Sequence, residues 1–210
     1  MIGRRSRRLW FNADHPAIAA WPLWLLGALA LVVALAGNAA TGLLRYEREQ
    51  VLAGEWWRLL SGQLVHLGPV HLLLNLAGLG LLAWLFAPAL RAAQWWGLLA
   101  GSWLGIALGF VLLEPQLAWY VGLSGVLHGL LAGGALMGSG LPTGLRPVLL
   151  LGILLKLGWE QWAGGAPATA GLVGGPIIVN AHLYGACGGL LAGVGATLPA
   201  LLRRYSPPPP

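Results

Sequence analysis

Long apolar segments with few charges inside them constrain the fold of this chain more than any other feature. Six can be marked, at about 17–37, 69–87, 93–113, 122–140, 145–162 and 178–202. Charged residues make up only 9% of the 210 residues, whereas soluble domains average about 25%. An apolar helix of about 20 residues matches the thickness of bilayer hydrocarbon. We therefore expect an all-α membrane protein, a bundle of six transmembrane helices over residues 17–202.

The distribution of basic residues predicts the orientation of the bundle. An even number of spans leaves the basic N-terminal segment (1–16) and the Pro-rich tail (203–210) on one side. Eight of the 12 Lys and Arg residues then share that side, and four lie opposite. Because cytoplasmic loops carry excess positive charge, both ends are expected in the cytoplasm. The net charge of +6 thus reports orientation rather than nucleic-acid binding.

Two further features bear on processing and on loops. The basic run 4–8 precedes an apolar run long enough to span, so the first segment is interpreted as a retained helix rather than a cleaved leader. The long connection 38–69, with the pair Trp56 and Trp57, is expected to lie in the outer interface, partly as short helices, although a simple anchored connector fits its composition too. The Gly/Ala/Pro stretch 164–176 predicts a loop with little helix.

Four polar side chains are predicted to gather at one depth in the outer half of the membrane. They are Ser124 in GLSGVLHG, His182 in NAHLYGACGG, and His71 and Asn75 in HLLLN. A single Ser or Asn in a membrane helix usually bonds a nearby carbonyl or a neighbouring helix. Polar groups from three separate helices at one depth instead indicate a functional site.

A serine nucleophile needs an adjacent base, and two histidines could supply it. His128 is four residues after Ser124 on the same helix face, where it is poorly aimed at the hydroxyl. His182 comes from another helix and can approach face-on, so we favour it. Glu114 and Glu160 end their segments, and no carboxylate is expected near the histidine. The sequence therefore predicts a Ser-His dyad.

Peptide hydrolysis also needs hydrogen-bond donors for the tetrahedral oxyanion. His71 and Asn75 share a helix face and both carry donors. The backbone N–H of Ser124, at a helix N-terminus, is a third donor. Gly122 and Gly125 would let the backbone approach closely. The single cysteine and the absence of an HExxH motif argue against a metal site, and no cofactor is expected.

The motifs HLGPVHLLLN, GLSG and AHLYGACGG, in this order, resemble those of rhomboid intramembrane serine proteases, and EWWRLLSGQLVH resembles the family's tryptophan-arginine motif. The resemblance covers about 17–202. It implies that Ser124 is the nucleophile and His182 the base, that His71, Asn75 and the Ser124 backbone form the oxyanion hole, and that Gly185 packs helices. Many rhomboids carry Tyr where this chain has His128, which could tune, orient or stack on the base.

The short length and GLSGVLHG are most similar to the rhombosortase branch. This resemblance implies an enzyme of the bacterial inner membrane with its active site open to the periplasm. Its partners would be transmembrane substrates with a C-terminal Gly-Gly motif, helix and basic tail, and a lipid-like amine that accepts the acyl group. The alternatives are a catalytically inactive rhomboid-like client-binding protein and a small transporter, although the spans hold almost none of the charges that a transport path needs.

Overall fold

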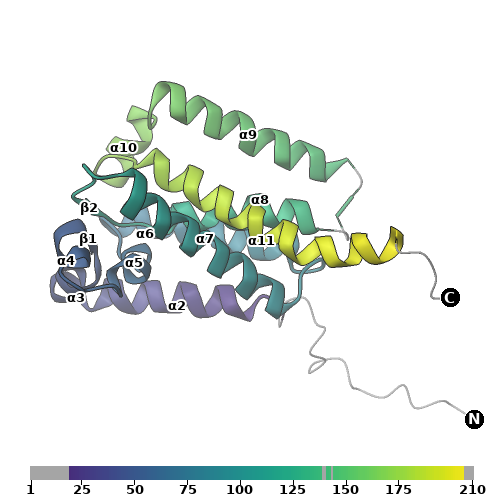
Figure 1. The fold of residues 1–210 in the computed structure, drawn as a ribbon. Helices are drawn as coiled ribbons and strands as arrows, with labels where there is room; N and C mark the ends of the chain where they lie inside the picture. Colours follow the sequence, from purple (N-terminus) through teal and green to yellow (C-terminus); the bar gives the residue numbers. More distant parts are fainter. Residues whose placement is uncertain (1–18, 139–140, 143, 206–210) are drawn as a thin grey trace, which may run out of the picture.

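The computed structural model describes residues 19–138, 141–142 and 144–205, which are mostly helical (Figure 1). The expected N-terminal segment 1–16 and most of the expected tail, from residue 206 on, lie outside these residues. The elements are, in chain order, α2 (Trp21–Leu35), α3 (Gly37–Leu44), β1 (Tyr46–Glu47), α4 (Arg48–Leu52), α5 (Arg58–Ser61), the 3-10 helix η1 (Gly62–Leu64), α6 (Pro69–Phe86), α7 (Ala92–Leu113), β2 (Trp119–Tyr120), α8 (Ser124–Met137), α9 (Leu145–Ala163), α10 (Pro167–Val173) and α11 (Val179–Tyr205).

Each of the six predicted apolar segments coincides closely with one of the long helices α2, α6, α7, α8, α9 and α11, which lie along one another in Figure 1. Among the described residues, α6, α7 and α11 are long and apolar enough to cross a membrane, and α2 with α3 adds a fourth span if this pair, bent by 117°, counts as one. Helix α9 falls short because it carries Arg146, Lys156 and Glu160.

Helix α8 is short for a membrane helix, and this shortness positions its first residue. Its 14 residues extend over only about 21 Å at the usual rise, less than the roughly 30 Å of bilayer hydrocarbon. The preceding residues Val121, Gly122 and Leu123 are non-helical and buried. Gly122 N–H donates to the carbonyl of Gly62 at 3.2 Å. Ser124 therefore starts its helix inside the bundle.

Glycines set the contact between α8 and α11. A Cβ on Gly185 would overlap the carbonyl oxygen of Gly125, and a Cβ on Gly189 would overlap that of Gly129. A Cβ on Gly125 would in turn come within 2.8 Å of the Ala181 carbonyl oxygen. The two backbones thus touch over several turns, as in other membrane helices that pack through small residues.

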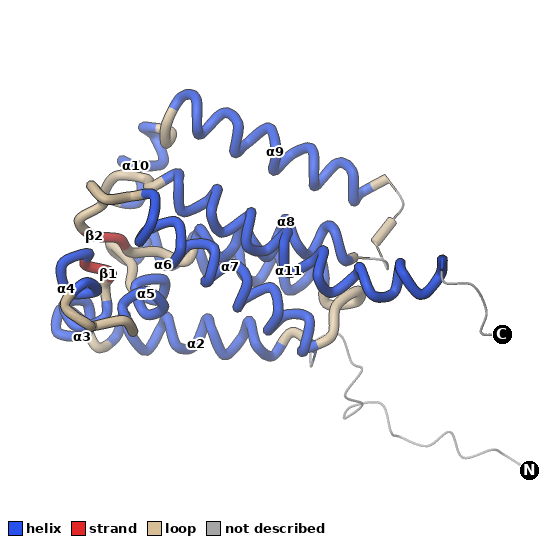
Figure 2. The backbone as a smooth tube through the Cα atoms, in the orientation of Figure 1, coloured by secondary structure: helices blue, strands red, loops and turns tan. Residues whose placement is uncertain are grey.

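The connection between α2 and α6 packs against the bundle. It contains short helices, as the sequence predicted. Arg58 is buried, and its guanidinium donates to the carbonyls of Gly42 and Arg45 at 2.9 and 2.8 Å. Strand β1 pairs antiparallel with β2, the two red segments of Figure 2, with Tyr46 opposite Tyr120. This pairing was not predicted, because two-residue strands leave no periodic pattern in the sequence.

The stretch 164–176 is where the predicted loop proves wrong. Residues Pro167–Val173 form α10, with Pro167 at the first helical position and Gly174 in the left-handed conformation at its end (φ 86°). Proline at the start and glycine past the end are the residues that bound helices most clearly. Proline and glycine in this stretch therefore mark the ends of a short helix rather than irregular chain.

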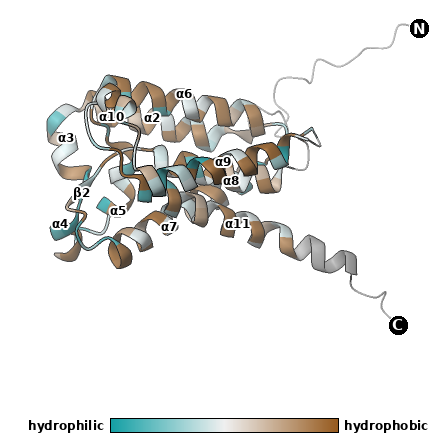
Figure 3. Cartoon of the chain, turned by 90° about the horizontal axis from the view of Figure 1, so that it is seen from above, coloured by the Kyte–Doolittle hydropathy of each residue, from teal (hydrophilic) through white to brown (hydrophobic). Residues whose placement is uncertain are grey.

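Apolar residues make up much of the long helices (Figure 3), and many of their side chains are exposed. On α6 the exposed ones include Leu73, Leu81 and Trp84, and on α9 they include Leu154 and Trp162. A soluble protein rarely exposes such continuous apolar surface. The chain is a membrane protein, and these side chains face lipid.

Candidate active site

A cavity of about 390 Å³ lies where α6, α8 and α11 begin, with α9 and α10 along its other side. The side chains of all four predicted polar residues line it, so the convergence predicted from three separate segments is present in the structure. The polar residues and one aromatic of the lining are His71, Asn75, Ser124, His128, Lys156, Trp159, Glu160, Thr169 and His182.

Ser124 and His182 are joined across the contact between α8 and α11. The Ser124 Oγ lies 2.9 Å from Nε2 of His182, which is a hydrogen-bond distance. Gly125 and Gly185 lie at the same contact, where the two backbones meet. The close approach of these helices is what lets a short serine side chain reach a histidine on another helix.

His128 does not reach the serine hydroxyl. Its Nδ1 lies 2.7 Å from the carbonyl oxygen of Ser124, one turn back on the same helix. Its ring stacks on that of His182, with centroids 4.1 Å apart and planes inclined by 13°. The sequence left three roles open for His128: tuning the base, orienting it or stacking on it. The structure shows that the His128 ring stacks on His182.

His71 and Asn75 present donors to the cavity. The backbone N–H of Leu67 donates to Nδ1 of His71 at 3.3 Å, so a neutral ring carries its proton on Nε2. Gly122, at φ +124°, gives that nitrogen room, because a Cβ there would come within 2.9 Å of it. The Asn75 amide donates one hydrogen to the His71 carbonyl at 3.0 Å and retains a second.

A carboxylate that the sequence analysis ruled out stands beside His182. Oε1 and Oε2 of Glu160 lie 3.1 and 3.0 Å from Nδ1 of His182. The prediction was wrong because the end of α9, although a segment boundary in the sequence, packs against the start of α11. One signal could have found it: Lys156 and Glu160 form a charged i,i+4 pair near the end of a largely apolar helix, at the predicted depth of His182.

Glu160 and the two neighbouring histidines carry atoms that can bind a metal ion. His128, Glu160 and His182 offer ligand atoms that all lie within 4.8 Å of one another. The two imidazole rings are stacked, however, so their lone pairs lie in separate, nearly parallel planes and do not converge on one ion. Each ring also has hydrogen-bond partners. The group suits a hydrogen-bonded network better than a metal centre.

His66 lies behind the site, in the segment before α6. Its ring packs edge-on against that of His71, with centroids 5.0 Å apart. Burial, and to a lesser degree the neighbouring His71, lowers the pKa of His66 to about 4. This ring therefore adds no positive charge next to His71 at neutral pH.

Comparison with known proteins places these residues in a family. The Rhomboid domain matches residues 53–198, a range that includes every residue of the cavity discussed above. The protein named "Putative rhomboid protease YdcA" of Bacillus subtilis (strain 168) is 31% identical over 153 residues, which cover 67% of each chain. Together with the helical architecture, these matches confirm the resemblance read from the motifs. The chain belongs to the rhomboid family of intramembrane serine proteases.

Proposed function

We propose that Ser124 is the nucleophile of this protease and His182 its general base. The observation that carries the proposal is the 2.9 Å hydrogen bond between the Ser124 hydroxyl and Nε2 of His182 inside the cavity. Nε2 accepts the serine proton as Oγ attacks the scissile carbonyl, and it later returns the proton to the leaving amine.

The oxyanion of the tetrahedral intermediate is held by three donors in this proposal. They are Nε2–H of His71, the free amide hydrogen of Asn75 and the backbone N–H of Ser124, the first residue of α8. The first N–H groups of a helix have no carbonyl partner within it, and they carry the positive end of the helix dipole. Gly122, Gly125 and Gly185 support the site by allowing close backbone contact.

The substrate reaches the serine as an extended segment. A helix with side chains is about 10 Å wide and its carbonyls are already bonded, and a cavity of about 390 Å³ offers room for a few residues of unwound chain. Glycine near the cut lowers the cost of unwinding, because it is about 1 kcal/mol less favourable in a helix than alanine.

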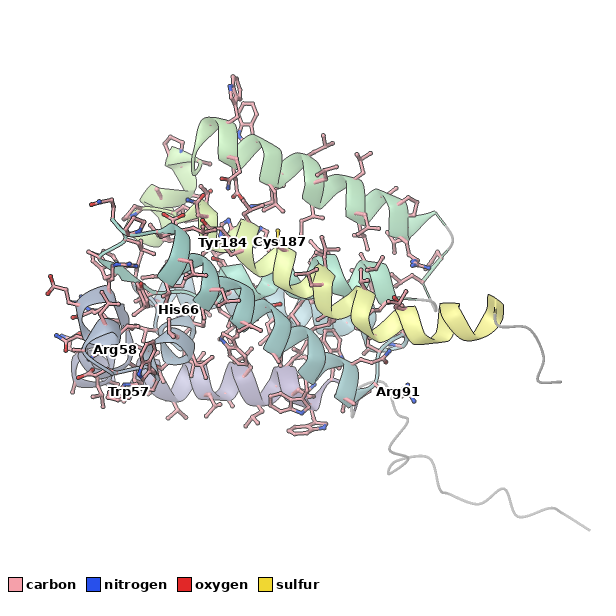
Figure 4. All side chains as sticks on the ribbon, in the orientation of Figure 1. Trp57, Arg58, His66, Arg91, Tyr184 and Cys187 are labelled. Carbon is pink, nitrogen blue, oxygen red and sulfur yellow. The ribbon has the colours of Figure 1, made fainter. Side chains whose placement is uncertain are left out.

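We place the protein in the bacterial inner membrane with six spans, both ends in the cytoplasm and the cavity open to the periplasm. The start of α2 and the end of α11 lie at the same end of the bundle in Figure 1, which supports an even number of crossings. Figure 4 shows Arg91 at that end, remote from Trp57 and Arg58. The excess of basic residues expected on the cytoplasmic side agrees with this orientation.

The proposed substrates are exported proteins with a C-terminal Gly-Gly motif, a hydrophobic helix and a basic tail. The motif GLSGVLHG, which includes His128, supports this assignment through its similarity to rhombosortases. The acyl-enzyme is passed to the amine of a lipid-like acceptor in this proposal, and water is the competing nucleophile. A client-binding protein without activity has no need of the intact hydrogen bond between Ser124 and His182.

The first test is labelling with a fluorescent fluorophosphonate on membranes that contain the wild type, Ser124→Ala or His182→Ala. We expect labelling of the wild type alone. Labelling of Ser124→Ala at the wild-type level would remove the nucleophile assignment. Incubation of the wild type with a substrate that ends in the sorting signal then separates the outcomes by mass: a free carboxylate shows hydrolysis, and an amide with the added amine shows transfer.

A further inference from the structure

We propose that Glu160 is a positioning residue that holds His182 in its active tautomer and neutralises its protonated form. The inference rests on the proposed roles of Ser124 and His182 and adds a third member to that dyad. The geometry of α9 and α11 carries it.

The hydrogen bonds of His182 define its tautomer. Nδ1 has both oxygens of Glu160 at 3.0–3.1 Å, and a carboxylate can only accept, so Nδ1 carries the hydrogen. The lone pair of a neutral ring is then on Nε2, which faces the Ser124 hydroxyl at 2.9 Å. Without an acceptor at Nδ1, part of the population would take the other tautomer, which points N–H at the serine oxygen and cannot act as the base.

The surroundings of His182 leave Glu160 as the one group that can balance an imidazolium. The titratable and charged groups facing it are His71 on α6, His128 on α8, and Lys156 and Glu160 on α9. Among the described residues that line the cavity, Glu160 is the only carboxylate. When His182 takes the serine proton, its new positive charge therefore forms next to a fixed negative one.

Lys156 helps keep that carboxylate in place. Its Nζ lies 2.5 Å from Oε1 of Glu160, one turn earlier on α9. Glu160 is only 9% exposed, and a buried carboxylate is costly unless it is paired and hydrogen-bonded. The side chain of Lys156 is 47% exposed and lines the cavity, where its ammonium pairs with Glu160. The three groups form an alternating chain of charge when His182 is protonated.

The test compares full-length Glu160→Gln and Glu160→Asp with the wild type, using kcat, KM and the pH profile for a cleavable substrate. We expect Glu160→Gln to lower kcat by about 10²–10⁴ with little change in KM, since a triad carboxylate acts on the chemical step. The acidic limb of its profile should move to lower pH, because the imidazolium has lost its counter-charge. Glu160→Asp keeps the charge and should recover part of kcat.

The matched control is Glu114→Gln. Glu114 also bonds α11, accepting from Tyr184 at 2.7 Å and from Asn180, but it does not contact His182. We expect the kcat of this variant to stay within about twofold of the wild type, a change of less than about 0.5 kcal/mol in activation free energy. Its pH profile should have the same shape as that of the wild type. Equal losses in both variants would assign Glu160 a structural role only. If Glu160→Gln keeps kcat within about threefold while Ser124→Ala is inactive, the inference fails and the dyad stands.

A measurement on the wild type avoids any question of whether a variant folds. Nitrogen-15 NMR of histidine-labelled protein, with His182→Ala used to assign the signal, reports which ring nitrogen carries the hydrogen. A protonated Nδ1 on neutral His182 supports the proposal. A proton on Nε2 at the pH of activity overturns it, whether or not the fluorophosphonate labels Ser124.

Discussion

The two sides of the cavity are built in different ways. On one side α8 and α11 touch through glycine backbones and hold Ser124 and His182 across that contact. On the other side α9 buries only Ile153, Leu157 and Glu160, and most of its surface is apolar and exposed. The nucleophile and base thus sit on a rigid support, whereas the carboxylate comes from a helix with few contacts.

This difference separates two requirements of an intramembrane protease. The distance between nucleophile and base must stay fixed within a fraction of an ångström for the proton to move. The proposed substrate must nevertheless reach a cavity that lies between elements of the bundle. A tightly packed pair of helices beside a loosely packed one meets both needs, and the two sides should therefore respond differently to substitution.

The largest effect is expected at the tight side. Gly185→Val places a side chain where the Gly125 carbonyl already lies, so α8 and α11 must separate. Because a displacement of about 1 Å can cost on the order of 10² in rate, we expect fluorophosphonate labelling and cleavage to fall at least that far. Gly195→Ala, where a Cβ meets nothing within 4 Å, is the control and should be neutral. Full activity in Gly185→Val would mean that the contact does not set the site.

A pair of leucines compares the stability contributed by the two sides. Leu130 on α8 is fully buried, whereas Leu154 on α9 is 66% exposed. Leu130→Ala should lower the free energy of unfolding by about 2–5 kcal/mol, and Leu154→Ala by less than about 0.5 kcal/mol. Denaturant unfolding in detergent measures both. Equal losses would show that α9 is packed as firmly as α8.

Asn75, on α6, tests the oxyanion hole. Asn75→Ala removes the amide that donates to the His71 carbonyl and retains a second hydrogen. We expect kcat to fall by about 10²–10³ with KM nearly unchanged, the usual cost of one oxyanion donor. Cleavage kinetics measure this loss. A rise in KM alone would indicate that Asn75 binds substrate instead.

The pH dependence of stability should report His66. Its pKa is lowered to about 4 in the folded protein from an ordinary 6.5, so the unfolded chain takes up the proton first as the pH falls. The stabilisation is complete above pH 6.5 and is lost toward pH 4, by at most about 3 kcal/mol. His66→Gln should flatten Tm in this window. An unchanged slope would show that other groups control it.

The smallest effect is expected for the stacked pair. His128→Ala removes the ring that lies on His182, and an aromatic pair contributes about 0.5–1.5 kcal/mol beyond its burial, so kcat should fall about tenfold or less. His128→Tyr keeps a ring for stacking and should retain most of the activity. A larger loss in the tyrosine variant than in alanine would point to a role for the imidazole itself.

The sequence was enough to predict the elements that depend on long periodic signals. The apolar segments, the meeting of Ser124 and His182 and the preference for His182 over His128 all follow from hydropathy and helix geometry. What it did not predict depends on tertiary contact. Glu160 lies at a segment end, and only the packing of α9 against α11 brings it to the base. Strands β1 and β2 and the short helix α10 likewise contain too few residues for a periodic hydrophobic pattern to appear in the sequence.

The glycine contact between α8 and α11 also limits how this enzyme can evolve. A backbone-to-backbone contact has no side chain that can be trimmed or lengthened, so compensating substitutions have nothing to act on. The positions of Gly125 and Gly185 therefore admit almost no variation, whereas the exposed face of α9 can change freely with the membrane or the substrate. Changes in specificity should therefore accumulate on α9 while the reacting pair stays as it is.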